Sequence, residues 1–264
     1  MEIEPAALGG TSSHTGMALD TQAVARDINF DPAARKAVVL RNQLLIGLSF
    51  STGIVDMIAF LALGKVFTAF QTGNLVFLGL GIIGHGPQGI ILPKTAWVIA
   101  SFLLFGVGAM VSARIVKPEE SKTTAWPKRV TVALVVTALA QVAFLVGWIA
   151  TSGHPTAAAG ATLAAIMAFG MGVQIHAARS LGVPDVSTTA ATATWVTFVS
   201  DIATRSLRGN GRFMRLYSMI AMVLGAAVGT YVIDNARLFV PALPLIITVL
   251  TMVIAAGALK PKSS

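Results

Sequence analysis

Six long apolar runs decide what this chain can fold into, because each has about 18 to 27 residues and almost no charge. A helix rises about 1.5 Å per residue, so about 20 residues cross the hydrocarbon of a bilayer. Lipid offers no partner to free backbone groups, so every run is predicted to be a membrane-spanning helix. The unbroken runs lack the alternating polarity of an outer-membrane barrel. They are Leu44–Leu63, Ile90–Val116, Val130–Ala150, Ala157–Ala178, Leu216–Ile233 and Leu238–Leu259.

Composition agrees with a membrane protein and excludes other classes. Apolar residues make up 55% of the chain and charged residues 11%, against about 25% charged in soluble domains. A soluble enzyme and a disordered protein are therefore excluded. Cysteine is absent, so no disulfide or thiolate site can form. The net charge of +8 indicates basic cytoplasmic loops rather than nucleic-acid binding, because the charges lie between the apolar runs.

Two weaker segments leave the number of spans open, and the basic residues favour six. Val66–Gly84 and Pro184–Ala203 are interrupted by polar residues, and each could be a full span, a re-entrant hairpin or a broken helix. If both return to the side they entered from, Lys and Arg divide 16 to 3 between the two sides, whereas eight full spans give 11 to 8. The positive-inside rule therefore predicts six spans and a cytoplasmic N-terminus in the plasma (inner) membrane.

The predicted organisation is a polar tail followed by one membrane domain. Residues 1–41 are polar and predicted to be disordered, although Asp31 and Pro32 suit the start of a short helix. Residues 42–260 form the membrane domain, an all-α polytopic bundle with the lipid bilayer as its main partner. Homo-oligomerisation is left open, because the Gly225 and Gly229 pattern permits close helix contact without indicating a dimer.

The membrane domain contains a weak internal repeat. Phe50–Gly53 resembles Phe169–Gly172, and Leu63-Gly64 resembles Leu181-Gly182. The repeats cover about 44–150 and about 157–259. Three spans separate the two copies in the six-span arrangement, so the second copy is inverted, as in many secondary transporters and channels.

Thr72, Gly73 and Asn74 interrupt an apolar run and are predicted to start a half-helix. This helix would run to Gly84, about 18 Å, or half a membrane. Its first amide groups would then point into the bilayer, where they could bind an anion or a polar solute. The alternative is a tight helix crossing. In the second copy, Thr188, Thr192 and Thr194, with Ser187 and Thr189, occupy the matching place, and Gln174 lies late in the preceding span.

Two ionisable residues inside predicted spans are candidates for ion or proton coupling. Asp56 lies within the first span, where a charge is costly and often marks an ion path. A structural acid bonded to a neighbouring helix is the alternative. His176 could relay protons near neutral pH, or it could be a neutral hydrogen-bonding residue.

Catalytic and cofactor motifs are absent from the sequence. There is no P-loop, no HExxH and no GxSxG. His14, His85 and His154 show no metal-ligand spacing. We therefore predict no enzyme activity, no cofactor, no metal site and no nucleic-acid partner.

The motifs named above resemble those of the YoaK-like family of membrane proteins, a domain of unknown function. In the first stretch the matching residues are Gly53, Asp56, Phe67, Phe70, Thr72, Gly73 and Asn74. In the second they are Gln174, Val186, Ser187, Thr188, Thr189, Thr192 and Thr194, while Ile175, His176 and Ala193 depart from the family pattern. The resemblance covers about residues 44–259. It implies an inner- or plasma-membrane protein of about six helices and implies no substrate.

The functional prediction is a small secondary transporter or permease for a small polar or anionic solute. A channel or pore would use the same broken helices. A membrane protein with a regulatory or structural role is the third hypothesis.

Overall fold

A computed structural model describes residues 32–83, 93–116, 126–182, 195–196, 198–200, 203 and 211–259. The chain divides into two compact units, residues 1–40 and residues 41–264. In the first, residues 32–40 are helical and the remaining residues lie outside the described part. The helical bundle belongs to the second unit.

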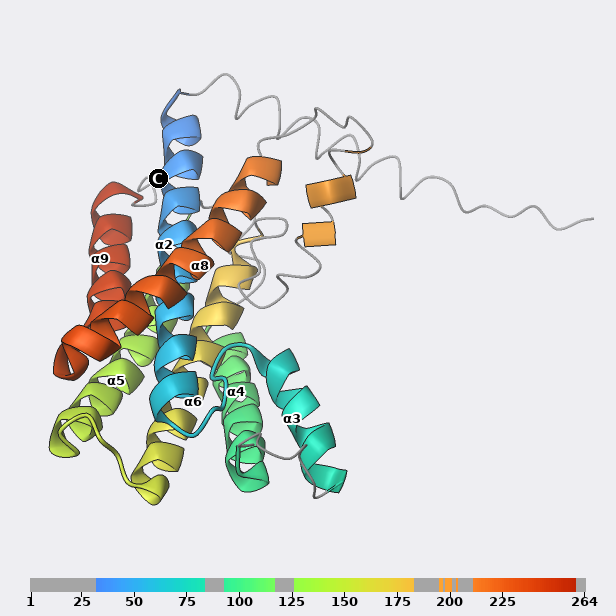
Figure 1. The fold of residues 1–264 in the computed structure, drawn as a ribbon. Helices are drawn as coiled ribbons and strands as arrows, with labels where there is room; N and C mark the ends of the chain where they lie inside the picture. Colours follow the sequence, from blue (N-terminus) through green and yellow to red (C-terminus); the bar gives the residue numbers. More distant parts are fainter. Residues whose placement is uncertain are drawn as a thin grey trace, which may run out of the picture. The chain divides into compact units, whose positions relative to one another are not determined.

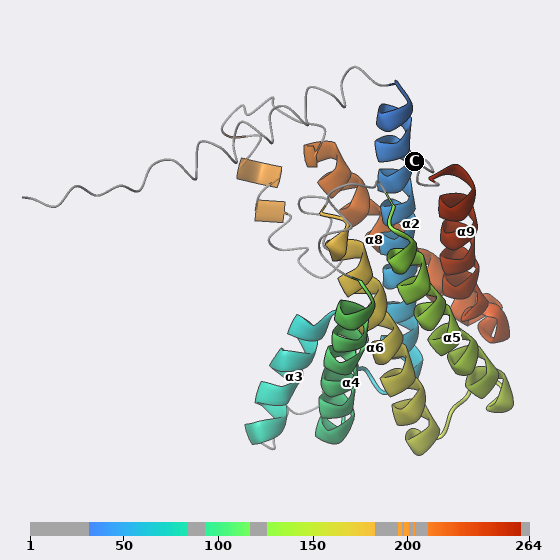
Figure 2. The same ribbon diagram turned by 180° about the vertical axis from the view of Figure 1, so that it is seen from behind.

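Six helices of the described part are long and apolar enough to cross a membrane, which confirms the polytopic bundle predicted from the apolar runs. Figures 1 and 2 show them from opposite sides. The 3-10 turn η2 (Arg237–Phe239) precedes the last of them. The six correspond to α2 (Pro32–Ala62), α4 (Thr95–Ile115), α5 (Lys128–Ala150), α6 (Ala157–Ser180), the part Phe213–Asn235 of α8 (Gly211–Asn235), and η2 together with α9 (Ala242–Ala258).

The first helix begins earlier than its apolar run. Residues 32–41, placed in the polar tail by the sequence, are the opening turns of α2. Pro32 occupies the first helical position, where its missing N–H costs nothing, and alanine, leucine and lysine follow as good helix formers. The short helix expected at Asp31-Pro32 is therefore continuous with the first span.

The segment Val66–Gly84 is a link followed by a half-helix rather than a span. Helix α3 (Gln71–Ile83) has 13 residues, which reach roughly 20 Å against about 30 Å of hydrocarbon. The chain leaves α2, turns back toward the bundle, and α3 returns to the end where α2 finishes (Figure 1). A Cβ on Gly81, near the end of α3, would touch Thr95 at the start of α4. The segment thus returns to the side it entered from.

The spans cross in two close pairs, each built on glycine. In the α2–α8 pair, a methyl on Gly53 would overlap the carbonyl of Met222, and one on Gly225 would overlap the carbonyl of Phe50. The Gly225 and Gly229 pattern therefore serves a contact within the chain.

The second pair, α4–α6, has the same construction. A methyl on Gly108 would overlap the carbonyl of Phe169, and one on Gly172 would overlap the carbonyl of Phe105. Both pairs run parallel: in the first, Gly225 meets Phe50 and Gly229 meets Ile54, and in the second Ser112 lies 3.1 Å from His176, one turn beyond the glycines. Small residues let backbones approach where lipid gives no hydrophobic drive for association.

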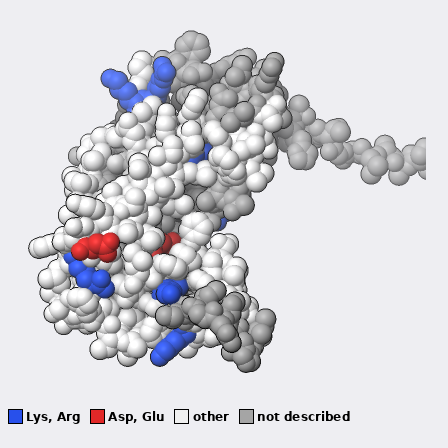
Figure 3. Space-filling view, in the orientation of Figure 1, with Lys and Arg blue, Asp and Glu red and all other residues white. Residues whose placement is uncertain are grey.

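The outer surface of the bundle suits lipid. Large apolar side chains are exposed along α4, α5, α8 and α9, among them Leu103, Leu139, Val223 and Val253. On the face drawn in Figure 3, uncharged side chains cover most of the surface and charged ones gather toward its two ends. Arg114, Lys128 and Arg179 lie at the end where α4 and α6 finish and α5 begins, while Lys65, Lys94 and Arg237 lie at the opposite end.

Candidate functional site in the bundle interior

Asp56 holds the link that precedes α3. One carboxylate oxygen accepts the backbone N–H groups of Thr68 and Ala69, both at 2.8 Å, and the Thr68 hydroxyl at 3.1 Å. The other accepts the N–H of Phe70 at 3.0 Å. Both oxygens therefore act as acceptors, and the side chain is 6% exposed. A negative group at the start of a helix also matches the partial positive charge of its N-terminus.

Asn74 closes the same link from its other side. Its amide oxygen accepts the N–H of Phe67 at 2.9 Å, and its amide nitrogen donates to the Phe67 carbonyl at 2.6 Å. Ser101 on α4 also donates to that carbonyl, at 2.6 Å. The pairing satisfies both backbone groups of a residue that belongs to no helix, as a bilayer interior demands.

Gly73 leaves room for an aromatic stack beside the link. The Phe67 ring lies between Phe60 and Phe77, with ring centroids 5.4 Å and 6.0 Å away. A Cβ on Gly73 would come to 2.7 Å from the Phe67 ring. Thr72, the first member of the Thr-Gly-Asn motif, is exposed on the outer face of α3.

Gly73→Ala is expected to lower the free energy of unfolding by about 1–3 kcal/mol, the usual cost of overpacking. The Phe67 ring is held on both faces and cannot move away freely. Gly79→Ala is the matched control on the same helix, because a Cβ there would meet nothing within 4 Å. Thermal unfolding of both purified variants measures the difference. Equal melting temperatures would mean that the stack yields without cost.

Asp56 brings a carboxylate close to the half-helix whose first amides are predicted to bind a ligand. We expected the first amides of the half-helix to bind an anion or a polar solute. The N–H groups that bond to the Asp56 carboxylate belong to residues 68–70, in the link before α3, so an anion approaching the start of α3 would meet a like charge. Binding at the first amides of α3 stays a prediction. Ion or proton coupling through Asp56 stays a prediction.

Three polar side chains in the centre of the bundle are buried with unused hydrogen-bonding capacity. Gln141 on α5 makes no hydrogen bond through either amide atom within the described part of the chain. The same holds for the Ser51 hydroxyl on α2 and for the amide oxygen of Gln174 on α6. All three are at most 1% exposed. Buried polar groups of this kind are costly and call for a polar partner.

Two hydrogen bonds between helices locate these side chains along the α2, α5 and α6 interfaces. Thr137 on α5 donates to the carbonyl of Gly170 on α6 at 3.3 Å. Gln141 and Gln174 each follow one of these residues by one helical turn, and because α5 and α6 are antiparallel the two side chains lie on opposite sides of this contact, about 12 Å apart along the helices. Gln174 in turn donates to the Leu48 carbonyl on α2 at 3.5 Å, three residues before Ser51. Polar atoms thus follow the α2–α6–α5 interface.

The second copy of the motif lies largely outside the described residues. This applies to Ser187, Thr188, Thr189, Thr192 and Thr194, so their predicted role stays a prediction. His176 is described, and its Nδ1 lies 3.1 Å from the Ser112 hydroxyl on α4. Among the described residues, no group of three His, Asp or Glu side chains is placed to hold a metal ion.

Sequence reasoning missed Gln141, Ser51 and Ser101. Gln141 carried a usable signal, because it is the only amide side chain in the apolar run Val130–Ala150. Ser51 and Ser101 carried none, since serine in an apolar helix usually bonds back to its own backbone.

The sequence of the chain is similar to known proteins. The family model described as "Protein of unknown function (DUF1275)" matches residues 44–256. Over 169 residues the chain is 35% identical to the UPF0700 transmembrane protein YoaK of Bacillus subtilis (strain 168), which covers 64% of this chain and 70% of that protein. No solved structure is significantly similar to the chain.

Proposed function

Because this chain belongs to the DUF1275 family of YoaK-like membrane proteins, we propose a function from its own interior: a small secondary transporter or permease for a small polar solute. The observation that carries the proposal is Gln141, an amide buried in the middle of a span with both polar atoms unpaired in the described protein. Polar residues inside a bundle commonly mark a substrate path. The proposal assigns the protein no catalytic reaction.

An inverted repeat supports this proposal. The glycine of α2 at the first crossing, Gly53, has its counterpart in Gly172 of α6, 119 residues later. Gly108 of α4 and Gly225 of α8 are 117 residues apart. The carbonyls that these glycines contact show the same two separations. Those of Phe105 and Met222 are 117 residues apart, and those of Phe50 and Phe169 are 119 residues apart.

Helix ends follow the same relation. Gly64 and Gly182 both have a positive φ, of 89° and 62°, directly after α2 and α6. The α2–α8 pair runs opposite to the α4–α6 pair, as a two-fold axis in the membrane plane requires. Transporters of this kind bind their substrates near the midplane, where the two repeats meet.

The interior favours a neutral or dipolar solute over a simple anion. Gln141, Gln174 and Ser51 offer amide and hydroxyl groups, which can donate and accept. The nearest described acid on α2, Asp56, follows Ser51 by five residues, about 7.5 Å along the helix. Its negative charge would repel an anion and tolerate a solute that carries donors.

Gln141→Leu is expected to abolish uptake without lowering the melting temperature, because leucine removes an unpaired buried amide at similar volume. The purified protein in liposomes would be offered amino acids, sugars, short carboxylates and inorganic ions. Saturable uptake of one class is expected, whereas non-saturating flux would indicate a pore. Leu139→Ala is the control, since Leu139 faces outward and is 63% exposed. Unchanged uptake in Gln141→Leu would remove the central argument.

We also propose that the bundle lies in the plasma (inner) membrane with its N-terminus in the cytoplasm. Among residues 41–259 that the structure describes, Arg41, Arg114, Lys128, Arg129, Arg179 and Arg215 lie at one end of the spans, and three basic residues lie at the other. This asymmetry is the pattern of the positive-inside rule.

Labelling of single cysteines tests the orientation, because the chain has no native thiol. Lys65→Cys is expected to react with an impermeant maleimide added outside intact cells. Arg114→Cys is expected to react only after the membrane is opened. The reverse pattern would invert the orientation, and labelling of both from outside would contradict the six-span arrangement.

A further inference from the structure

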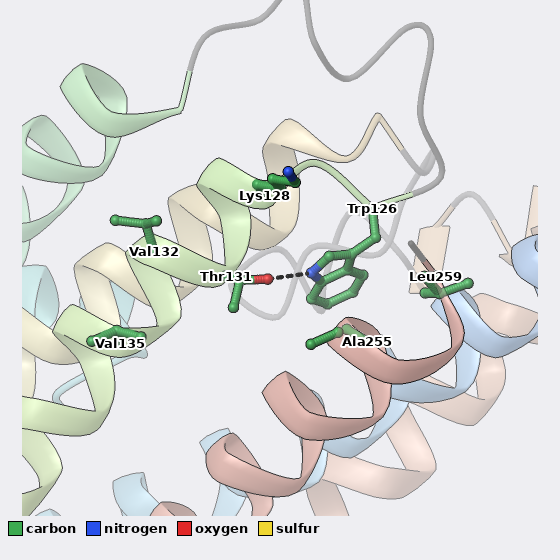
Figure 4. Close-up of a pocket in the computed structure, with 8 residues that line it drawn as sticks. Trp126, Lys128, Thr131, Val132, Val135, Ala255 and Leu259 are labelled. Atoms are coloured by element: carbon green, nitrogen blue, oxygen red, sulfur yellow. Dashed lines mark hydrogen bonds between the residues drawn. The ribbon is translucent and has the colours of Figure 1, made fainter. Parts of the chain in front are cut away.

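A cavity opens between the start of α5 and the end of α9, away from the interior path. Its volume is about 390 Å³. Figure 4 shows it bounded by α5 on one side and α9 on the other, with Trp126 between them. The lining residues are Trp126, Lys128, Thr131, Val132, Val135, Ala255, Ala256 and Leu259.

The two ends of this cavity differ in chemistry. Lys128 and Thr131 bring an ammonium and a hydroxyl to the end nearest the start of α5. Val135, Ala255 and Ala256 make the rest of the wall apolar. Val132 and Val135 are 51% and 44% exposed, so the cavity opens sideways to the surroundings of the bundle. Such a site fits an amphiphilic molecule that approaches from within the bilayer.

Trp126 orients the polar end. It is 3% exposed, and its indole N–H donates to the Thr131 hydroxyl oxygen at 3.0 Å. Because that oxygen accepts the indole proton, the Thr131 hydroxyl proton is available for another acceptor. The first turn of α5 holds no acidic residue and no side-chain cap, so its partial positive charge adds to that of Lys128.

We propose that this cavity binds one anionic phospholipid, with its phosphate at Lys128 and Thr131 and an acyl chain along the apolar wall between α5 and α9. Charge complementarity selects the headgroup, because Lys128 lies at the basic end of the spans. A free phosphate has no apolar part that could pack against the apolar wall. Basic pockets between membrane helices are known to hold anionic headgroups. A bound lipid would join α5 to α9.

Native mass spectrometry of the full chain tests the site. The probes are phosphatidylglycerol and phosphatidylcholine with identical acyl chains, and inorganic phosphate. Preferential retention of one phosphatidylglycerol is expected. Lys128→Gln should weaken it about fivefold, the effect of one basic residue beside an anionic headgroup. Val135→Trp, which fills the apolar wall, should weaken it as well.

Lys94→Gln is the matched control, because Lys94 also precedes a span and lies near a tryptophan, its ammonium 5.3 Å from the Trp97 ring centroid. It should leave lipid binding unchanged. Lys128 is exposed, so its variant should fold, and its melting temperature without added lipid verifies this. Equal retention of the two lipids, displacement by inorganic phosphate, or equal effects of the two lysine variants would each overturn the proposal.

Discussion

Asp56→Ala is expected to be the most destabilising single substitution in the described bundle. It would leave the N–H groups of Thr68, Ala69 and Phe70 without an acceptor inside the membrane region. Hydrogen bonds to a charged group contribute about 1.5–3 kcal/mol each, so a total loss of about 3–5 kcal/mol is a conservative expectation. That loss corresponds to a melting temperature roughly 10 °C lower in a chain of this size.

Two further variants make the Asp56 result specific. Asp234→Ala removes an exposed acid near the end of α8 and should melt like the parent protein. Asp56→Asn should fall between the parent and Asp56→Ala. Its amide oxygen can still accept from the link, but its NH₂ group would face the Phe70 N–H, donor against donor. A stable Asp56→Asn variant with an altered pH dependence of uptake would assign Asp56 to coupling instead.

The second large effect is expected at the glycine crossings. Gly108→Ala would drive a methyl group into the carbonyl of Phe169 and to 3.1 Å from the amide nitrogen of Val173. Backbone atoms cannot rotate away, so α4 and α6 must separate, at a cost of about 3 kcal/mol or more, the upper range for overpacking.

Gly106→Ala, on the same helix, is the internal control. A Cβ there meets nothing within 4 Å. Replacing glycine by alanine inside a helix otherwise stabilises by about 0.5–1 kcal/mol, so Gly106→Ala should melt at or above the parent temperature. Thermal unfolding in detergent compares the two variants. If both melt alike, α4 and α6 do not touch at Gly108 in the membrane.

The same measurement tests the inverted repeat. Gly53→Ala and Gly172→Ala change two glycines that the proposed inverted repeat makes equivalent, and a methyl on either would overlap a backbone carbonyl of another helix. Their losses of stability should agree within about 1 kcal/mol, since the lost contacts are alike. A large loss at one and none at the other would mean that the two halves are not related by symmetry.

Much of the fold was predictable because lipid imposes one rule on the whole chain. The boundaries of the runs Val130–Ala150 and Ala157–Ala178 lie within two residues of the boundaries of helices α5 and α6. The half-helix α3 begins one residue before the predicted Thr72. Helix boundaries of this kind follow from length, apolar content and cap residues, all of which are local in sequence.

The contacts of the candidate site were not predictable, because they depend on a link without periodicity. Asp56 bonds to backbone groups 12 to 14 residues further along the chain. The residue types of positions 63–70 do not indicate that this stretch turns back toward α2. Asn74 is predicted from the sequence to help start the half-helix, and the sequence does not show that its amide bonds to the backbone of Phe67 and to the side chain of Gln71.

The glycine pairs have a consequence for how the chain is made. The glycine crossings join α2 to α8 and α4 to α6, so each half supplies only one helix of each pair. A ribosome delivers α4 well before α6, and α2 long before α8. The backbone groove at Gly53 therefore stays uncovered until the fifth of the six spans enters the bilayer. Separately expressed halves would each carry two such grooves, and these grooves could close only where the two halves meet in one membrane. In the order of synthesis, the α4–α6 groove can therefore close first and the α2–α8 groove only later.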